Sequence, residues 1–115
     1  MDASSIYGVS NAMTSALRSH VNGMLESNLN SQESFPAFNE REMPMYNPTV
    51  GETRPPKRRN GNELFGFGNA RGNENPFLIT VSTIWFRWHN VLADRFAREN
   101  PDWTDEKVCF WLNYM

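Results

Sequence analysis

The sequence RGNENPFLITVSTIWFRWHNVLADRFARENP, residues 71–101, decides how this chain folds. Pro76 suits the first turn of a helix, where its missing N–H costs nothing, and Asn73 or Asn75 can cap that end. Apolar residues then recur every three or four positions, which predicts an amphipathic core helix from about residue 77 to residue 99. This apolar stripe consists of Leu78, Val81, Trp85, Trp88, Leu92 and Phe96.

Charged residues on the predicted helix lie away from the apolar stripe. Arg87, Asp94 and Arg98 occupy the other positions, and Asp94 and Arg98 are four residues apart, so their side chains can pair. Asn100-Pro101 ends the helix, because the residue before a proline disfavours helical geometry.

A second helix is expected after Asp102 or Thr104. Asp105 and Glu106 would lie in its first turn, where the positive end of the helix dipole favours acidic side chains. The last residues, 109–115, carry aromatic side chains that we expect to be exposed.

The N-terminal part predicts another short helix. Ser10 or Asn11 can cap it, and Met13, Leu17 and later apolar residues follow helical spacing to about Leu25. His20 lies in this stretch, and we expect it to be exposed.

Residues 26–70 predict a long irregular loop. Asn, Ser and Glu dominate its first half, and prolines break any regular element. The basic run Lys57-Arg58-Arg59 is expected to be solvated. The five prolines are Pro36, Pro44, Pro48, Pro55 and Pro56.

The glycine-rich end of this loop is not a nucleotide-binding motif. Gly66-Phe67-Gly68 lacks a further glycine three positions on, and no strand precedes it. We expect Phe65 and Phe67 to be buried, and the glycines to allow tight turns beside crowded surroundings.

Composition excludes several classes of partner. The chain has 115 residues and a net charge of −2, which argues against binding to nucleic acid or to an anionic membrane. The tripeptide Ile84-Trp85-Phe86 is typical of a homeodomain, but Trp88 occupies the position where an adenine-reading asparagine is needed. Cys109 cannot form an intrachain disulfide because it is the only cysteine.

The sequence predicts neither a signal peptide nor a membrane-spanning segment. The N-terminus has neither a basic start nor an apolar core of signal-peptide type, and the longest apolar run, residues 77–86, is too short to cross a bilayer. The sequence alone therefore predicts a soluble chain.

Three polar residues in the central stretch carry possible chemistry. His89 stands among tryptophans, where a neutral imidazole could bind haem iron, although a lone histidine there is more often a satisfied core residue. Arg71 and Glu74 are three residues apart before the helix, where a salt bridge with capping is the simpler interpretation. Residue types alone favour the structural roles.

A resemblance reverses both interpretations. The segments Arg71-Gly72-Asn73-Glu74-Asn75-Pro76 and Trp85-Phe86-Arg87-Trp88-His89-Asn90 resemble the animal haem peroxidase family, most of all the peroxidase-like ectodomain of dual oxidases. The resemblance implies a mainly α fold with a long irregular loop, in which residues 1–115 form part of a haem peroxidase domain. Its expected parts are residues 2–25, 26–70, 71–101 and 102–115.

The resemblance also implies roles for individual residues. Arg71 would be the catalytic distal arginine, Glu74 the residue that forms an ester with the haem, and His89 the proximal ligand of the haem iron. Arg87, inside the second motif, would also contact the cofactor. The distal histidine would lie upstream of this chain, and the asparagine that orients the proximal histidine would lie downstream.

The opening residues imply a calcium site. Asp2-Ala3-Ser4-Ser5-Ile6-Tyr7-Gly8 resembles the Asp-x-Ser-x-x-Tyr-Gly segment of a calcium loop, so Asp2 and Ser4 would be two of its oxygen ligands. Asn75 stands where some members of the family have a methionine that attaches to the haem.

The implied function is that of a haem peroxidase, with haem and calcium as cofactors. It would use hydrogen peroxide to oxidise phenolic, tyrosyl or halide donors. The alternative is a non-catalytic peroxidase-like module that associates with a full-length peroxidase or oxidase chain. The expected parent is a membrane protein with this domain on the extracellular side.

Overall fold

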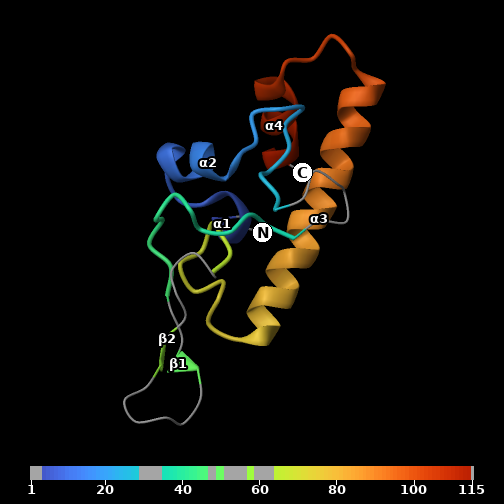
Figure 1. Ribbon diagram of the computed structural model, residues 1–115. Helices are drawn as coiled ribbons and strands as arrows, with labels where there is room; N and C mark the ends of the chain where they lie inside the picture. Colours follow the sequence, from blue (N-terminus) through green and yellow to red (C-terminus); the bar gives the residue numbers. More distant parts are fainter. Residues whose placement is uncertain (1–3, 29–34, 47–48, 51–56, 59–63, 115) are drawn as a thin grey trace.

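Two helices near the C-terminus form one side of the molecule. The computed structural model describes residues 4–28, 35–46, 49–50, 57–58 and 64–114. In Figure 1, α3 (Pro76–Glu99) runs along the whole of this side, and α4 (Asp105–Tyr114) folds back beside its second half. The architecture is mainly α-helical, which confirms the predicted fold class.

The structure confirms where the sequence predicted that α3 begins and ends. The Asn75 side chain caps the start by accepting a hydrogen bond from the Leu78 N–H at 3.0 Å, and Pro76 is the first helical residue. At the other end, the Asn100 N–H donates to the Phe96 carbonyl at 3.0 Å. The predicted pair forms, with Arg98 Nη2 2.8 Å from Asp94 Oδ2.

The N-terminal helix is shorter than expected. After a first turn of helix, α1 (Ser4–Tyr7), the helix α2 (Asn11–Leu17) begins at the predicted cap, Ser10. It was expected to reach Leu25 but ends at Leu17. The extension was wrong because Arg18 turns into extended backbone and pairs with α4, and because His20, Asn22 and Gly23 have positive φ angles. His20 is exposed, as predicted.

The described parts of residues 26–70 are largely irregular, as predicted. One small exception is the antiparallel pair β1 (Thr49–Val50) and β2 (Lys57–Arg58). Isolated bridges join Ser27 to Pro36 and Phe38 to Phe65, so the loop folds back on itself. Arg59, the last residue of the predicted basic run, lies outside the described residues.

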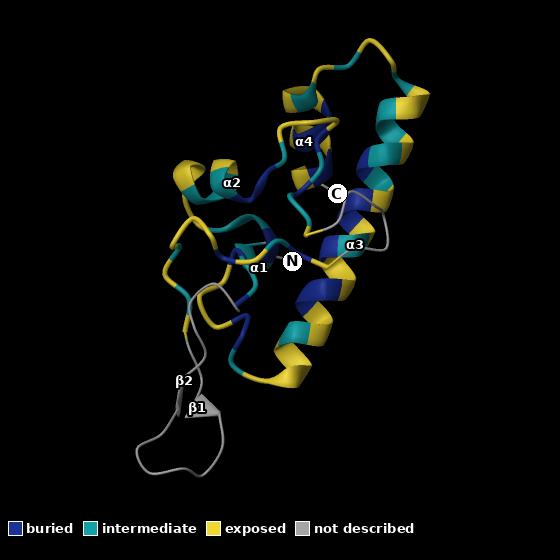
Figure 2. Ribbon diagram, viewed as in Figure 1, coloured by how far each residue is buried: buried dark blue, intermediate teal, exposed yellow. Residues whose placement is uncertain are grey.

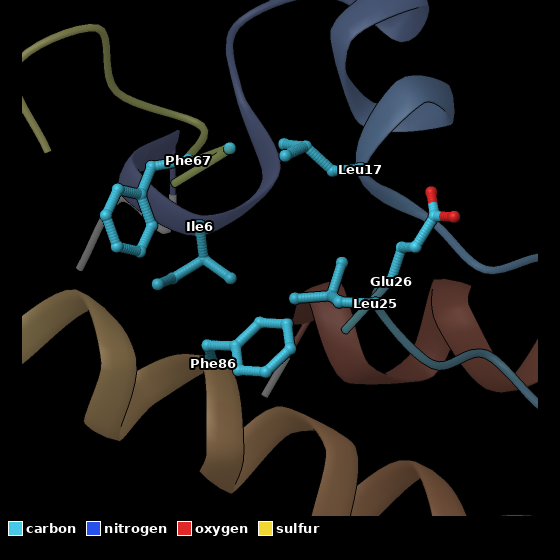
Figure 3. A pocket seen from close by; sticks show the side chains of 7 residues that line it. Ile6, Leu17, Leu25, Glu26, Phe67 and Phe86 are labelled. Carbon is cyan, nitrogen blue, oxygen red and sulfur yellow. The ribbon is translucent and has the colours of Figure 1, made fainter. Parts of the chain in front are cut away.

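Two apolar clusters hold the helices together. The first joins the N-terminal half of the chain to the middle of α3, and the tiny cavity within it, about 10 Å³, has no room for more than about one water. Figure 3 shows side chains from α1, α2, the following loop and α3 converging on this cavity. The second cluster joins α3 to α4. The buried members are Ile6, Leu17, Leu25 and Phe86 in the first cluster, and Ala93, Val108 and Leu112 in the second.

The orientation of α3 differs from the prediction of a core helix with a buried apolar stripe. In Figure 2 buried and exposed bands alternate along α3, and its buried face contains several polar residues. Trp85 and Trp88 are 45% and 54% exposed. The prediction was wrong because hydrogen bonds to the N-terminal segment, rather than apolar area, select the inner face. That face consists of Ser82, Thr83, Phe86, His89, Asn90 and Ala93.

Within the part of the chain that the structure describes, no helix combines the length and apolar character needed to cross a bilayer.

Candidate functional site

His89 lies on the inner face of α3 and contacts the N-terminal part of the chain through both ring nitrogens. Nε2 is 2.8 Å from the Gly23 carbonyl oxygen, and Nδ1 is 2.6 Å from the Tyr7 hydroxyl. A carbonyl can only accept, so Nε2 carries the proton and donates it, while Nδ1 accepts from the hydroxyl. These partners therefore define one neutral tautomer and use the free lone pair of the ring.

Burial keeps both members of this pair neutral. His89 is 4% exposed, and desolvation lowers its pKa to about 4, assisted by the nearby charge of Arg18 and opposed by the hydrogen bond to Gly23. Desolvation also raises the pKa of Tyr7 to about 12, so its hydroxyl keeps the proton that it donates. The two rings meet edge to face, with centroids 5.2 Å apart.

Asn90 continues the same attachment along the chain. Its side-chain oxygen accepts from the Leu25 N–H at 2.8 Å, and its amide donates to the Leu25 carbonyl at 3.2 Å. His89 and Asn90 together bind the backbone of residues 23–25 to α3. From the sequence, a structural role was weighed for His89 but that of Asn90 was missed, although two adjacent polar residues within an apolar helix were a usable signal.

Gly23 connects α3 to α4. Its carbonyl accepts from His89, and its N–H donates to Asp105 Oδ1 at 2.5 Å. The buried guanidinium of Arg18 also pairs with Asp105, and its Nη1 lies 3.2 Å from Glu106 Oε1. Asp105 and Glu106, which were predicted to stabilise the start of α4, therefore also bind Arg18 in the segment before Gly23.

Arg71 and Glu74 belong to a tight turn whose backbone is fixed by its own polar groups. The buried Asn73 side chain accepts from the Phe65 N–H at 2.9 Å and donates to the Phe65 carbonyl at 2.8 Å. The Arg71 N–H donates to Asn69 Oδ1, and the Glu74 N–H donates to the Arg71 carbonyl, both at 2.9 Å. The turn is rigid although its two charged residues lie at its surface.

The packing of Phe67 against this turn explains why position 72 is a glycine. A Cβ at this position would lie 2.4 Å from Cδ2 of Phe67, a ring that is only 3% exposed. Gly68 is similarly crowded, since a Cβ there would lie 2.3 Å from the Gly8 nitrogen. The predicted role of the loop glycines, to permit close approach, is confirmed at Gly68. Phe67 is buried as expected, whereas Phe65 is only half-buried.

The side chains of Arg71 and Glu74 remain available. Arg71 is exposed and Glu74 is half-buried, and among the described residues neither side chain has a hydrogen bond or ion pair. The salt bridge between them, which was the simpler alternative before the resemblance was considered, is therefore not formed. Arg87 is half-buried, and its guanidinium lies over the Phe35 ring, 4.9 Å from the centroid.

The two parts of the predicted haem site are separate in this structure. Pro76 and His89 are 13 helical steps apart, which corresponds to roughly 20 Å along the helix axis. His89 faces the packed N-terminal segment, whereas the Arg71 side chain is exposed. The structure does not bring Arg71, Glu74 and His89 into one contact.

These positions fit a haem only in part. A guanidinium and a carboxylate presented by a rigid turn suit the polar edge of a haem and its ligand. His89 does not fit as an iron ligand in this arrangement, because its protonated Nε2 and the lone pair of its Nδ1 are both used within the protein.

The described residues do not test the predicted calcium ligands, which stay a prediction. Asp2 lies outside the described residues, and Ser4 is the first residue of α1. Within the described ranges, no group of three or more His, Cys, Asp or Glu residues could hold a metal ion.

Comparisons with known proteins define the class. The family model described as animal haem peroxidase matches residues 1–110, and the chain therefore belongs to that family. Two human relatives, "Dual oxidase 2" and "Dual oxidase 1", are each 38% identical over 111 residues, which cover 94% of this chain. "Dual oxidase 1" from Caenorhabditis elegans is 37% identical over 108 residues.

A solved structure agrees with these relatives. "Peroxidase A from Dictyostelium discoideum (DdPoxA)" superposes with a TM-score of 0.82 and 32% identity over 97% of this chain. The chain spans 20% of that peroxidase and 7% of each of these dual oxidases. The predicted family and the likeness to dual oxidases are confirmed.

Proposed function

We propose that this chain forms one segment of a haem-dependent peroxidase domain that uses hydrogen peroxide to oxidise phenolic, tyrosyl or halide donors. The observation that carries the proposal is the rigid turn before α3, which presents the side chains of Arg71 and Glu74 without partners among the described residues. Membership of the animal haem peroxidase family supplies the context for these two charges.

In this proposal the chain positions charge, while bound haem would supply the oxidising chemistry. Arg71 would stabilise negative charge that develops on peroxide, because a fixed guanidinium is already oriented when that charge appears. Glu74 would bind the edge of the haem and could be esterified to it. Arg87, held against Phe35, would be a further cofactor contact.

Iron ligation by His89 stays a prediction that the described geometry does not favour. Binding through either nitrogen requires the imidazole to give up the Gly23 carbonyl or the Tyr7 hydroxyl. We therefore assign the proposed catalytic contribution to Arg71 and Glu74. Calcium binding by Asp2 and Ser4 also stays a prediction.

The saturated state of His89 favours a second candidate function. The chain would then be a non-catalytic peroxidase-like module that associates with a full-length peroxidase or oxidase chain. For either function, the proposed parent is a membrane protein that carries this domain on its extracellular side, as the likeness to dual oxidases suggests.

A chimera tests the proposal. This chain replaces the matching segment of Dictyostelium peroxidase A, and the absorbance of bound haem and the peroxide-dependent oxidation of a phenol are measured. We expect Arg71→Gln to lower turnover by about a hundredfold, the magnitude typical of removing one preorganised donor. Arg95→Gln, which changes another exposed arginine, is the matched control and should keep full turnover.

The outcomes of this experiment separate the two candidates. Equal turnover of the Arg71→Gln and Arg95→Gln chimeras would overturn the role of Arg71. A chimera that binds haem but has no turnover would favour the non-catalytic module. Loss of haem absorbance in a folded His89→Asn chimera would restore the assignment of His89 as a ligand.

A further inference from the structure

The outer face of α3 is apolar along three helical turns, although it points away from the rest of the chain. We define this outer face as Val81, Ile84, Trp85, Trp88 and Val91, whose spacing places them on one side of the helix. Their exposed fractions run from 39% at Val91 to 59% at Ile84. The opposite side of α3 is the polar and apolar inner face that packs against residues 7–25.

This arrangement reverses the usual polarity of a surface helix. His89 and Asn90 are buried because their hydrogen bonds to Tyr7, Gly23 and Leu25 are satisfied only there. The two tryptophans are consequently turned outward. Rotating α3 to bury them would leave those polar groups without partners, so the exposure of the outer face is fixed by the fold.

The outer face also has the shape and chemistry of an interface. Four of its residues line a shallow open depression together with Arg87, the only charged residue there. The Arg87 guanidinium lies over the Phe35 ring, and the other four lining residues are apolar. Contiguous exposed apolar surface of this kind marks a binding region, and tryptophans contribute most strongly to binding energy.

We propose that the outer face of α3 packs against an apolar, weakly charged and mainly helical surface supplied by the remainder of a peroxidase domain. The reason is the difference between the share of this chain and the share of peroxidase A that the superposition covers. Nearly the whole of this chain superposes on peroxidase A, yet it accounts for only 20% of that chain. A member of this family thus has a large body of further polypeptide around the same structural unit.

Other partners fit the outer face less well. Helices that lie on anionic membranes carry lysines and arginines on the polar side, whereas this depression has a single arginine turned onto a ring. A second copy of the chain would offer the same outer face, and dimerisation is therefore tested below as an alternative. The proposal rests on membership of the family and not on peroxidase activity.

Photocrosslinking in the peroxidase A chimera tests this directly. The photoreactive residue p-benzoylphenylalanine replaces Trp88, and in a matched chimera it replaces Arg95, whose side chain is 70% exposed and charged. We expect position 88 to crosslink to peroxidase A residues outside the replaced segment, and position 95 to give at most a few per cent as much. Crosslinks form without haem or turnover, so this result is independent of the proposed catalytic function.

Several results would overturn the proposal. Crosslinks from position 88 that stay within this chain, that join two chimera molecules, or that do not exceed those from position 95 would each do so. Failure of the unsubstituted chimera to fold, when peroxidase A itself folds, would also overturn it, because the outer face would then lack a matching surface.

A paired substitution gives a second measurement. Trp85→Glu with Trp88→Glu should leave the helical circular dichroism of the isolated 115-residue chain unchanged. In the chimera, the same pair should lower the equilibrium constant for folding, measured by urea denaturation, by on the order of thirtyfold. Ala12→Glu, on the exposed surface of α2, should have no effect in either setting. Binding of the unsubstituted chain to phosphatidylserine vesicles, or its dimerisation in sedimentation with loss in the paired variant, would identify another occupant and contradict the proposal.

Discussion

His89, within α3, and the turn at Arg71, just before α3, differ in how their polar groups are used. At His89 both ring nitrogens have partners within the chain, and the histidine itself is buried. At the turn the backbone is fixed by Asn73, while the charged side chains have no partner among the described residues.

This difference shows which residues serve the fold and which remain available to something else. A saturated buried group contributes stability, and its removal leaves its partners unsatisfied. A charged side chain that has no partner within the described residues contributes little to stability, so it remains available for binding or chemistry. The following variants test that division.

The largest effect is expected for His89→Asn. The shorter side chain cannot reach both partners, so the Tyr7 hydroxyl and the Gly23 carbonyl lose their hydrogen bonds inside the protein. We expect a loss of about 4 kcal/mol in the free energy of unfolding, measured by urea denaturation, from two unsatisfied groups. His20→Asn is the control: His20 is exposed with a positive φ of 59° that asparagine tolerates, so its loss should stay within about 0.5 kcal/mol. Equal losses would contradict a structural role for His89.

The second prediction concerns pH. The pKa of His89 is about 4 in the folded chain and 6.5 for the unperturbed side chain, so the unfolded state binds the proton more readily. Stability from this group is complete above pH 6.5 and falls as the pH drops from 6.5 toward 4, by up to about 3 kcal/mol. Unfolding measured across this range should show the slope in the native chain and lose it in His89→Asn. A slope that persists in the variant would assign it to other groups.

How much of this fold could be predicted depends on whether the signal was local. The cap at Asn75, the end of α3 before Pro101 and the acidic start of α4 were predictable because neighbouring residues determine them. The end of α2 at Leu17 was not, because Arg18 leaves the helix to reach acids about ninety residues away.

The candidate site shows the same limit. Residue types at Arg71 and Glu74 identified a charged turn, but Asn73, which fixes it, was considered only as a cap. The periodicity of α3 identified an apolar stripe without saying which side would be buried. That choice depends on hydrogen bonds between His89 or Asn90 and residues 7–25, which no pattern within the helix reveals.

The third prediction, of intermediate size, is for Gly72→Ala. The added methyl group would overlap the buried ring of Phe67, which cannot move aside without disturbing the core, so we expect a loss of about 2 kcal/mol. Gly66→Ala is the control, because the new Cβ would come close only to the flexible end of Met43, at 2.9 Å, while the Ala37 carbonyl oxygen and Leu17 would lie at ordinary contact distances of 3.5 and 3.8 Å. Thermal unfolding of both variants gives the comparison, and a Gly66→Ala loss as large as that of Gly72→Ala would contradict this steric explanation.

The smallest effect on stability is expected at the two available charges. Arg71→Gln and Glu74→Gln should each change the free energy of unfolding of this chain by no more than about 0.5 kcal/mol, since neither side chain has a partner among the described residues. Asn73→Ala, in the same turn, should cost about 2 kcal/mol, because it leaves both backbone groups of Phe65 unsatisfied. Urea denaturation of the three variants measures the contrast. A loss above about 1 kcal/mol for Arg71→Gln would place its guanidinium among the groups that hold the fold, and would remove the reason for assigning it to bound peroxide.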